Sequence, residues 1–351
     1  MNARTVERPT IKTICAMTGL STATVSKALR ASAEVRPETR AIVQAAAEKV
    51  GYSANLHGVQ LRTGKTYQVA VLMTAPTADM TEWEGVEYAQ LLAGISHAME
   101  DTRYRVGLYA VRDYAEAQET LRQIIRNRQA DGVILSGTRP EDARVRLLQD
   151  AGFPFVTYGT TSAHRAHAFV DADNERIIRT TLERLIARGH RRIALLNPPE
   201  HLSYGQNRLT AYRAVLAAHD LPFDPRLVAH GRLTPGFGRT QVMIMHALAD
   251  PPTAYVCANE AAALGALSGF TDCGLVHGRD AVINATDDLN VSAYFTPPLT
   301  TFYLPISRPA ELLGRHILRV MDGDPVDRLQ TLLMPDLIER SDDRLRPQER
   351  P

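Results

Sequence analysis

Residues 21–29 read Ser-Thr-Ala-Thr-Val-Ser-Lys-Ala-Leu, and this stretch decides the fold of the first part of the 351-residue chain. It follows an apolar segment, residues 11–17, and a turn that contains Gly19. Serine and threonine favour the position just before a helix, so Thr10 and Ser21 predict two helix starts. Because glycine permits a tight turn, we expect two short helices packed as a helix-turn-helix. The apolar residues expected between them are Ile14, Leu20, Val25 and Leu29.

The outward face of the second helix carries only short or basic side chains. These are Thr22, Ala23, Thr24, Ser26 and Lys27. Such a face fits into a DNA major groove and donates to phosphates and base edges. Lys27 is its one long donor, whereas Ala23 offers only a methyl group for apolar contact, for instance with thymine. On these residues alone, an ordinary helical hairpin at the protein surface is the alternative interpretation.

A third helix is expected after a loop at residues 34–38, with Pro37 in its first turn, where a missing N–H does no harm. Gly51 ends it. The residues expected on its buried face are Ile42, Val43, Ala46 and Val50. Three short helices form a small domain of marginal stability, which would plausibly need DNA or a partner to order fully.

Basic residues are concentrated at the amino-terminal end. Residues 1–66 contain 10 Lys and Arg against 4 Asp and Glu, a net charge of +6. The remainder contains 30 against 35, a net charge of −5, so that the whole chain carries +1. This distribution fits nucleic-acid contact confined to one end, with a solvated basic face as the alternative.

Several classes of protein are disfavoured by the sequence. Three cysteines (Cys15, Cys257 and Cys273) lack metal-ligand spacing and fit a reducing cytoplasm, where they would act as small buried apolar residues. No apolar run approaches ~18 residues, so neither export nor membrane insertion is expected. The motifs GxSxG, GxGxxG, GxxxxGK and HExxH are absent, so we predict no enzyme, metal or cofactor, and structural or solvated roles for His190 and His316.

From residue 68 onward, short apolar runs suited to buried strands alternate with helical patterns. The expected strands are residues 69–73, 106–109, 132–135, 155–158, 193–196, 254–257 and 281–284. The expected helices are residues 88–102, 115–126, 141–151, 176–187, 208–218 and 260–269. Such alternation predicts an α/β fold of doubly wound parallel sheets, and two series predict two lobes. A ligand would then lie between the carboxyl ends of the two sets of strands.

Five blocks in the first part resemble the headpiece of the lactose-repressor (LacI) family of bacterial transcription regulators, and five more resemble its ligand-sensing core. The first five are residues 9–12, 19–26, 35–40, 45–52 and 61–66. The other five are residues 130–135, 170–175, 188–194, 257–260 and 293–301. The resemblance implies a small all-α helix-turn-helix headpiece joined to a two-lobed core like that of periplasmic sugar-binding proteins.

The resemblance implies a division of labour on the DNA side. Residues matching Thr22, Ala23 and Lys27 read bases in the family, and those matching Thr24 and Ser26 help to hold the backbone. The complete implied set of DNA contacts is Thr10, Ser21, Thr22, Ala23, Thr24, Ser26, Lys27, Asn55 and Leu61.

A hinge helix at residues 54–61 is also implied, with Leu61 as a wedge in the minor groove. This chain departs from the family pattern there, because Ala54 replaces a frequent proline, Gly58 an alanine and Val59 an arginine. Gly58 weakens a helix by about 1 kcal/mol relative to alanine, so we expect the hinge to order less readily. A linker leucine that packs on the body is the alternative for Leu61.

The resemblance implies the domain boundaries. The headpiece is expected over residues 1–53, the hinge and linker over 54–66, the two-lobed core over 67–341 and a tail over 342–351. The chain would cross between the lobes near residues 160, 304 and 328. The N lobe would therefore comprise about 67–160 plus 305–328, and the C lobe about 161–304 plus 329–341.

Ligand contacts are expected first from Arg208 and Asp287, which match a family arginine and aspartate that bind the effector. Arg208 offers a fork of donors, and Asp287 accepts from hydroxyl groups. Tyr158 could cover the apolar face of a sugar ring. Three further residues are candidates for ligand contacts. Trp83 lies in a polar loop, where a ligand role and an exposed position are equally plain interpretations. Tyr88 is equally suited to the hydrophobic core, and Asn259 is equally suited to capping a helix. Glu260 replaces a family aspartate, which puts that contact in doubt.

Together these patterns predict a cytoplasmic, nucleoid-associated, homodimeric transcription regulator, which we expect to be a repressor. It would bind an inverted-repeat operator in double-stranded DNA and sense a small-molecule effector. A sugar is favoured, and a purine-like metabolite is the alternative. A periplasmic sugar-binding protein would explain the body but not the basic amino-terminal part.

Overall fold

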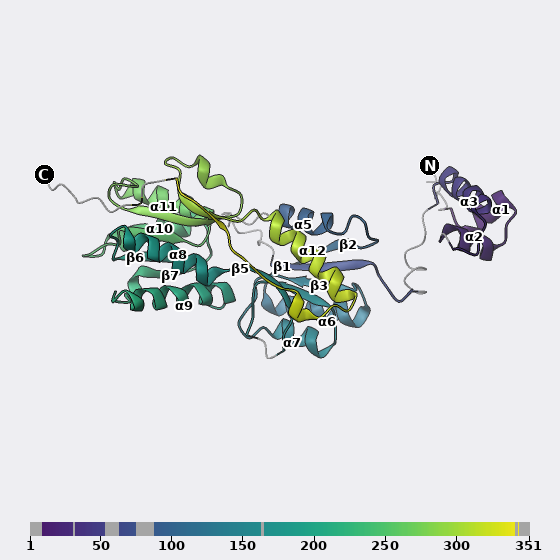
Figure 1. Ribbon diagram of the computed structural model, residues 1–351, viewed down its shortest axis with the longest axis horizontal. Coiled ribbons are helices and arrows are strands. Elements are labelled where there is room, and N and C mark those ends of the chain that lie inside the picture. Colours follow the sequence, from purple (N-terminus) through teal and green to yellow (C-terminus); the bar gives the residue numbers. More distant parts are fainter. Residues whose placement is uncertain are drawn as a thin grey trace, which may run out of the picture. The chain divides into compact units, whose positions relative to one another are not determined.

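The computed structural model describes residues 9–30, 32–52, 63–74, 88–162, 165–340 and 343. The chain divides into two compact units, Met1–Thr66 and Tyr67–Pro351, which are described separately (Figure 1). The first unit is helical and the second is α/β, as the sequence predicts.

The headpiece contains α1 (Ile11–Thr18), α2 (Thr22–Leu29) and α3 (Pro37–Lys49). Thr10 is the N-cap of α1, and its backbone N–H donates to Thr13 Oγ1 over 3.0 Å. The N-cap of α2 is Ser21, whose Oγ accepts from the backbone N–H of Thr24 over 3.2 Å. Gly19 ends α1 with φ of +68°, a left-handed conformation that costs glycine little. The predicted helix-turn-helix is therefore confirmed.

The headpiece core is small. Its fully covered residues are Ile14, Val25, Ala28, Val35, Val43, Ala46 and Ala47, and Leu20, Leu29 and Val50 pack at its edge. The prediction for Ile42 is wrong, because 56% of this residue is exposed. Val43, Ala46, Ala47 and Val50 form the inward stripe of α3, and Ile42 lies beside this stripe on the helix surface.

The larger unit contains two sheets of six strands, ordered β11-β5-β4-β3-β1-β2 and β12-β10-β9-β8-β6-β7. The first sheet consists of β1 (Gln68–Thr74), β2 (Arg105–Val111), β3 (Gly132–Leu135), β4 (Phe155–Tyr158), β5 (Ala168–Ala172) and β11 (Gln330–Leu333). The second consists of β6 (Ile193–Asn197), β7 (Val228–His230), β8 (Ala254–Cys257), β9 (Val282–Asp287), β10 (Thr300–Tyr303) and β12 (Asp336–Ile338). All pairs are parallel except β10 with β12, which form an antiparallel edge.

Helices cover both faces of each sheet. The helices of the first lobe are α5 (Tyr88–His97), α6 (Tyr114–Asn127), α7 (Ala143–Asp150) and α12 (Ser307–Met321). Those of the second lobe are α8 (Asn174–Ala187), α9 (Ser203–Ala218), α10 (Pro235–His246) and α11 (Glu260–Asp272). Short 3-10 turns lie at Pro225–Leu227, Val291–Tyr294 and Val326–Arg328. The predicted fold class is confirmed.

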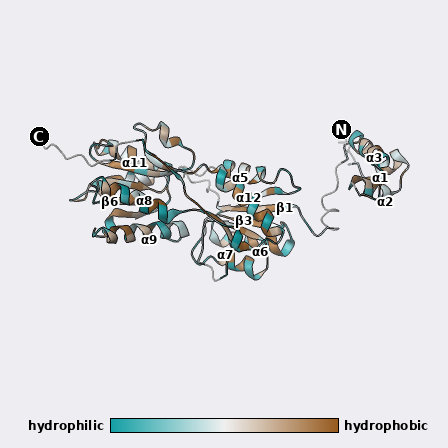
Figure 2. Cartoon of the chain, in the orientation of Figure 1, coloured by the Kyte–Doolittle hydropathy of each residue, from teal (hydrophilic) through white to brown (hydrophobic). Residues whose placement is uncertain are grey.

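Alternation along each strand divides its side chains between two helical layers. Val69, Val71 and Met73 of β1 face α5 and α12, whereas Ala70 and Leu72 face α6 and α7. The second sheet divides in the same way between α10 with α11 and α8 with α9. Figure 2 shows hydrophobic strands between helices whose surfaces include hydrophilic residues. Burial on both faces explains why these strands are continuous apolar runs.

The chain crosses between the lobes three times. The first crossing joins β5 to α8 near residue 173, rather than near residue 160 as the resemblance implied. The second follows β10 at residues 304–306, and the third joins β11 to β12 at residues 334–335, later than the expected 328. The difference arises because the sequence pattern did not predict β5 and β11, and both of these strands extend the first sheet.

The helix α10 was not predicted, because Pro235, Gly236 and Gly238 give it a weak helical pattern. The glycines are needed for close packing against α11. A Cβ at Gly238 would lie 2.0 Å from the carbonyl oxygen of Ala262, and one at Gly265 would lie 1.8 Å from that of Pro235. Tertiary packing therefore selects residues that local propensity disfavours.

We predict that Gly265→Ala destabilises the protein by about 1–3 kcal/mol, the usual cost of overpacking. Alanine improves helix propensity by about 1 kcal/mol, but the clash is with backbone that cannot rotate away. Urea unfolding of the full chain measures the difference. Ser268→Ala on the same helix is the control and should cause no loss; equal stability of the two variants would contradict the prediction.

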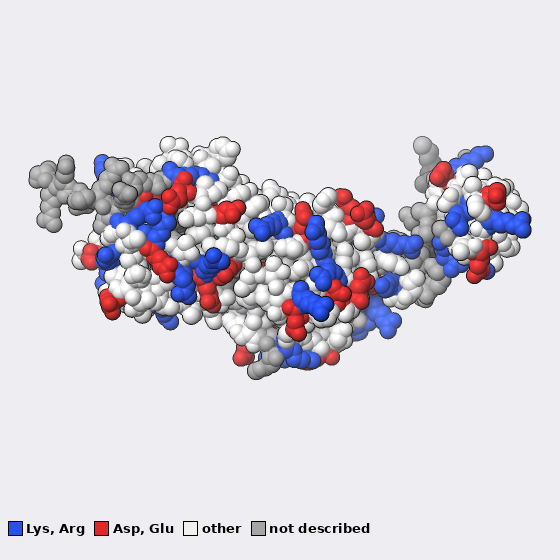
Figure 3. Space-filling model, viewed as in Figure 1, with Lys and Arg blue, Asp and Glu red and all other residues white. Residues whose placement is uncertain are grey.

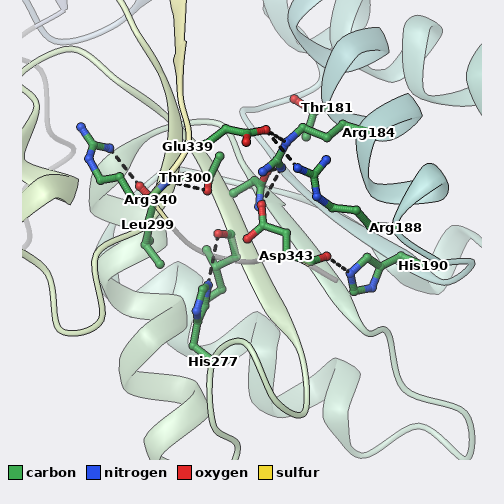
Figure 4. Close-up of polar contacts among 12 residues, drawn as sticks. Thr181, Arg184, Arg188, His190, His277, Leu299, Thr300, Glu339, Arg340 and Asp343 are labelled. Atoms are coloured by element: carbon green, nitrogen blue, oxygen red, sulfur yellow. Dashed lines mark hydrogen bonds and ion pairs between the residues drawn. The ribbon is translucent and has the colours of Figure 1, made fainter. Parts of the chain in front are cut away.

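A buried polar network in the second lobe joins α8, β9 and the segment after β12 (Figure 4). Arg184 Nη1 on α8 donates to Asp343 Oδ2 over 2.5 Å and to Asn284 Oδ1 on β9 over 2.9 Å. The backbone carbonyl of Asp343 accepts from His190 Nε2 over 2.8 Å. Glu339, just after β12, accepts from Arg184 Nε over 2.7 Å. Residues near the end of the sequence therefore hold α8 and β9 together.

Removal of Asp343 should be costly, because it leaves the buried guanidinium of Arg184 without its buried carboxylate. We predict that Asp343→Ala lowers the free energy of unfolding by about 3 kcal/mol. The matched control is Asp150→Ala, which breaks an exposed ion pair with Arg165 and should cost about 0–1 kcal/mol. Chemical denaturation measures the free energy of unfolding of both variants. Similar decreases in this free energy would show that Asp343 contributes no more than a surface charge.

Candidate functional site

The exposed face of α2 is the first candidate site. Thr22, Ala23, Ser26 and Lys27 are spaced as helical neighbours, and all but the half-buried Ser26 are exposed. Arg30 follows on the same face and donates to the carbonyl of Ser26 over 2.9 Å. Small side chains therefore surround two long basic ones, a shape that can enter a major groove.

Other headpiece candidates have structural partners. Ser21 Oγ lies 2.9 Å from Thr24 Oγ1, so both hydroxyl groups already serve the start of α2. Thr10 is exposed and pairs with Thr13. Asn55 and Leu61, together with the departures at Ala54, Gly58 and Val59, lie outside the described residues. In the larger unit, Figure 3 shows acidic and basic side chains interspersed over the face in view.

Arg208 is the centre of the second candidate site, which lies in the second lobe. This residue of α9 is 1% exposed, and its Nη1 lies 3.4 Å from both Asn174 Oδ1 and Thr286 Oγ1. Its Nε and Nη2 have no hydrogen-bond partner in the described part of the chain. Burial lowers the pKa of Arg208 to about 10. Buried, unsatisfied donors are costly, so this guanidinium is suited to bind an oxygen-rich ligand.

Carboxyl groups gather around Asp288, whose charge acts on Glu260 and on Tyr158. Asp287 ends β9 and is fully buried; its two oxygens accept from the backbone N–H groups of Leu289 and Ser292 over 3.0 and 2.9 Å. Asp287 therefore shapes the turn that follows it. The next residue, Asp288, has its pKa raised to about 7 by burial and by the charge of Asp287. The sequence prediction named Asp287, whereas Asp288 is the more accessible of the two.

Glu260 and Asp171 complete the set of carboxyl groups. Glu260 starts α11, is 1% exposed, and its Oε1 has no partner among the described residues. Burial and the neighbouring Asp288 raise its pKa to about 9, so the group is neutral at pH 7. Asp171 lies on β5, and burial raises its pKa to about 6, although its Oδ2 accepts from the N–H of Thr160 over 3.0 Å. The described residues contain no cluster arranged to hold a metal ion.

The predicted aromatic and amide contacts separate into two groups. Tyr158 ends β4, and burial and the charges of Asp288 and Asp171 raise its pKa. Tyr88 packs on the N-lobe core, and its hydroxyl donates to the carbonyl of Thr74 over 3.3 Å. Asn259 caps α11, with its Oδ1 accepting from the N–H of Ala262 over 2.9 Å. Trp83 lies outside the described residues.

Two contacts bridge the lobes at the start of α9. The N–H of Ser203 donates to the carbonyl of Thr138 over 2.9 Å, and Asn207 Nδ2 donates to Thr160 Oγ1 over 3.3 Å. A cavity of about 510 Å³ opens nearby and shares Asp288 with the carboxyl cluster. Arg208, Tyr158 and Asn259 do not line this cavity. The buried groups without partners are therefore stronger candidates for ligand contacts than the residues that line this opening.

Asp288, Glu260 and Asp171 were not among the candidate site residues predicted from the sequence. The doublet Asp287-Asp288 directly after a predicted strand was the available signal. Glu260 was noted only as a departure from the family pattern. Asp171 was not named because the sequence pattern did not predict the strand β5, on which it lies.

Two protein-family models match the chain. The family described as bacterial regulatory proteins, lacI family, matches residues 10–55, and the periplasmic binding protein-like domain matches residues 182–341. The HTH-type transcriptional regulator AglR of Rhizobium meliloti (strain 1021) is 32% identical over 295 residues, which cover 83% of this chain and 82% of AglR. The chain belongs to the LacI family. As a member of that family it is an effector-controlled, DNA-binding transcription regulator and not an enzyme, which confirms the predicted function.

Solved structures of LacI-family regulators share the fold. The transcriptional regulator CelR–cellobiose complex is 26% identical, with a TM-score of 0.70 over 95% of this chain and 99% of that chain. The lac repressor dimer bound to operator and the anti-inducer ONPF is 21% identical, with a TM-score of 0.82 over 97% of this chain and 100% of that chain. None of the helices in the described ranges combines the length and hydropathy needed to span a bilayer.

The raised pKa of Glu260 predicts a pH-dependent stability. Its pKa is about 9 in the folded chain against an ordinary 4.5, so the neutral carboxyl contributes stability that is fully present below about pH 4.5 and is lost as pH rises towards 9. Each pH unit in this window costs at most about 1.4 kcal/mol. Glu260→Gln cannot ionise, so we expect its free energy of unfolding to rise relative to that of wild type between pH 5 and pH 9.

Urea unfolding at pH 5, 7 and 9 measures this trend. Glu183→Gln on α8 is the control, because Glu183 is exposed and its substitution should leave the pH dependence of wild type unchanged. If Glu260→Gln and Glu183→Gln follow the same pH profile, Glu260 is ionised in the folded protein and the assignment is wrong.

Proposed function

We propose that this regulator is a homodimeric repressor that reads an inverted-repeat operator through α2 and senses an uncharged, hydroxyl-rich small molecule, a sugar, between its lobes. The observation that carries the proposal is the buried guanidinium of Arg208, whose Nε and Nη2 have no hydrogen-bond partner among the described residues. The similarity to CelR, whose solved complex contains cellobiose, supports a sugar.

On the DNA side, the proposal assigns base contacts to Thr22, Ala23 and Lys27. Thr24 and Ser26 would help to hold the backbone, and Ser21 would position α2 through its cap. One helix of 8 residues in one groove supplies limited specificity, so two headpieces on a two-fold axis are needed for a long operator. The solved structure of the lac repressor dimer bound to operator supports this arrangement. The contacts of Thr10, Asn55 and the wedge Leu61 remain proposals from the family resemblance.

The charge of the cleft favours an uncharged ligand. The carboxyl groups of Glu260, Asp287 and Asp288 lie close enough for their charges to act on one another, and the charges of Asp171 and Asp288 act on Tyr158. A phosphate or carboxylate on the ligand would meet more acidic than basic groups. Hydroxyl groups suit this set, because they donate to carboxylates and accept from a guanidinium or from a neutral carboxyl group. Tyr158 would cover the ring.

The two sites are proposed to communicate through the arrangement of the lobes. A ligand bound to Arg208 on α9 would bias the contacts of Ser203 with Thr138 and of Asn207 with Thr160. A ligand shifts this equilibrium only by its difference in affinity for the two arrangements. We further propose a hinge and linker over residues 54–66 and action in the cytoplasm on nucleoid DNA, since the target of the headpiece is DNA. The expected end of the core at residue 341 is wrong, because Asp343 is buried and bonded to Arg184.

A thermal-shift screen of the full chain tests the ligand class. The panel contains neutral sugars including cellobiose, sugar phosphates, uronic acids and nucleobases. We expect a neutral sugar to raise the melting temperature, since a ligand at 100 times its Kd adds about 2.7 kcal/mol of stability. A shift only with phosphorylated, acidic or purine-like compounds would contradict the proposed class.

Arg208→Met should then abolish this shift without loss of DNA binding, because Arg208 lies in the core unit and not in the headpiece. Loss of a charge-assisted pair that leaves buried acceptors costs about 2–5 kcal/mol of binding. The matched control is Arg213→Met on the same helix, whose guanidinium stacks on Phe223. Retention of the thermal shift in Arg208→Met, with the fold intact, would remove Arg208 from the site.

A further inference from the structure

Lys27, the long donor at the middle of the exposed face of α2, is not free in the headpiece. Its Nζ lies 2.5 Å from Oε2 of Glu34, in the connection between α2 and α3. The two side chains are 46% and 69% exposed, so the pair stands in solvent on the outside of the headpiece. Arg30 also lies near enough for its charge to act on Glu34. A carboxylate therefore accompanies the basic groups on the face that would enter DNA.

The position of Glu34 is held by the fold. The N–H of Ser32 donates to the carbonyl of Lys27 over 3.1 Å, and the N–H of Val35 donates to the carbonyl of Ser32 over the same distance. Arg40 on α3 donates to the carbonyl of Ser32 over 2.9 Å, and Val35 is buried in the headpiece core. Glu34 lies between these anchored residues, so its backbone is held where the carboxylate can reach Lys27.

We infer that Glu34 is a specificity-determining residue, and that Lys27 and Glu34 together read one G·C base pair in each operator half-site. This inference rests on the proposed reading face of α2 and adds to it a residue and a base preference. Guanine presents two adjacent acceptors, N7 and O6, in the major groove, and cytosine presents the N4 donor beside them. An ammonium group and a carboxylate set side by side are complementary to that pattern.

An A·T pair fits the same two groups less well. Adenine N6 is a donor that lies between two acceptors, adenine N7 and thymine O4. A carboxylate that accepts from N6 would therefore face acceptors on both sides. In addition, hydrogen-bonded atoms of a base pair are about 2.9 Å apart, which is close to the separation of Lys27 Nζ and Glu34 Oε2. The two charged atoms can therefore address neighbouring groups of a single G·C pair.

Glu34 should also weaken binding to unrelated DNA. A carboxylate on the reading face repels phosphates, and it occupies the ammonium group that would otherwise neutralise one of them. The exposed ion pair is weak, so a correct base pair can replace it. Glu34 thus raises discrimination by disfavouring the wrong partner as well as by binding the right one.

The test selects duplexes from a randomised pool with full-length wild type, Glu34→Gln, Lys27→Ala and a matched control, Glu48→Gln. Glu48 is exposed near the other end of α3, and its substitution removes the same charge without contacting Lys27. Circular dichroism verifies that each variant is folded. We expect wild type and Glu48→Gln to select G·C at one fixed position in each half-site, and Glu34→Gln to lose about tenfold of that preference there and nowhere else.

Binding to a duplex of unrelated sequence gives the second readout. Glu34→Gln should bind it more tightly, with a slope of log K against log salt that is steeper by about 0.9, because Lys27 gains one phosphate contact. If Glu34→Gln matches Glu48→Gln in base preference and salt slope while Lys27→Ala loses the preference, the role of Glu34 is overturned and the reading face stands. If Lys27→Ala also selects the same duplexes with the same affinity, the reading face itself is overturned.

Discussion

Both faces of each parallel sheet must be buried, and this constraint governs the larger unit. Each strand alternates its side chains between two helical layers, so the chain has to pass from one face to the other through crossover helices. These connections place the carboxyl ends of the parallel strands along one edge of each sheet. Tyr158, Asp171 and Asp287 all lie at or near these carboxyl ends. The proposed ligand site is therefore a consequence of the way the sheets are covered.

The cleft concentrates charged groups that the interior of a protein ordinarily excludes. Arg208 and Glu260 are almost completely buried, and each retains a polar atom without a partner among the described residues. Such groups cost stability, and proteins keep them where a ligand can satisfy them. The raised pKa values of Glu260 and Asp288 express the same cost, because both acids retain their protons more readily than they would in water. A polyhydroxylated molecule can donate hydrogen bonds to the carboxylates and accept hydrogen bonds from the guanidinium group.

The headpiece is stabilised by a much smaller hydrophobic core than the larger unit. Its core consists of a few aliphatic residues, so caps at Thr10 and Ser21 and the bonds of Arg40 contribute a large share of its order. The reading face has small side chains that permit close approach and one ion pair that imposes selectivity. Lys27 alone would attract any phosphate, whereas Lys27 beside Glu34 distinguishes between base pairs.

Much of this architecture was already determined by the sequence alone. Local signals were sufficient for α1, α2 and most strands, because caps, glycine turns and apolar runs act over a few residues. They failed for α10, whose glycines serve packing against α11, and for Ile42, which lies beside the buried stripe of α3. Arg208 and Asp287 became candidates through the family resemblance, and Tyr158 through its aromatic ring near the end of a predicted strand. The partnership of Glu260 with Asp288, the ion pair of Lys27 with Glu34 and the closure by Asp343 were decided only by the tertiary structure, since burial and contact between residues distant in the chain exist only after folding.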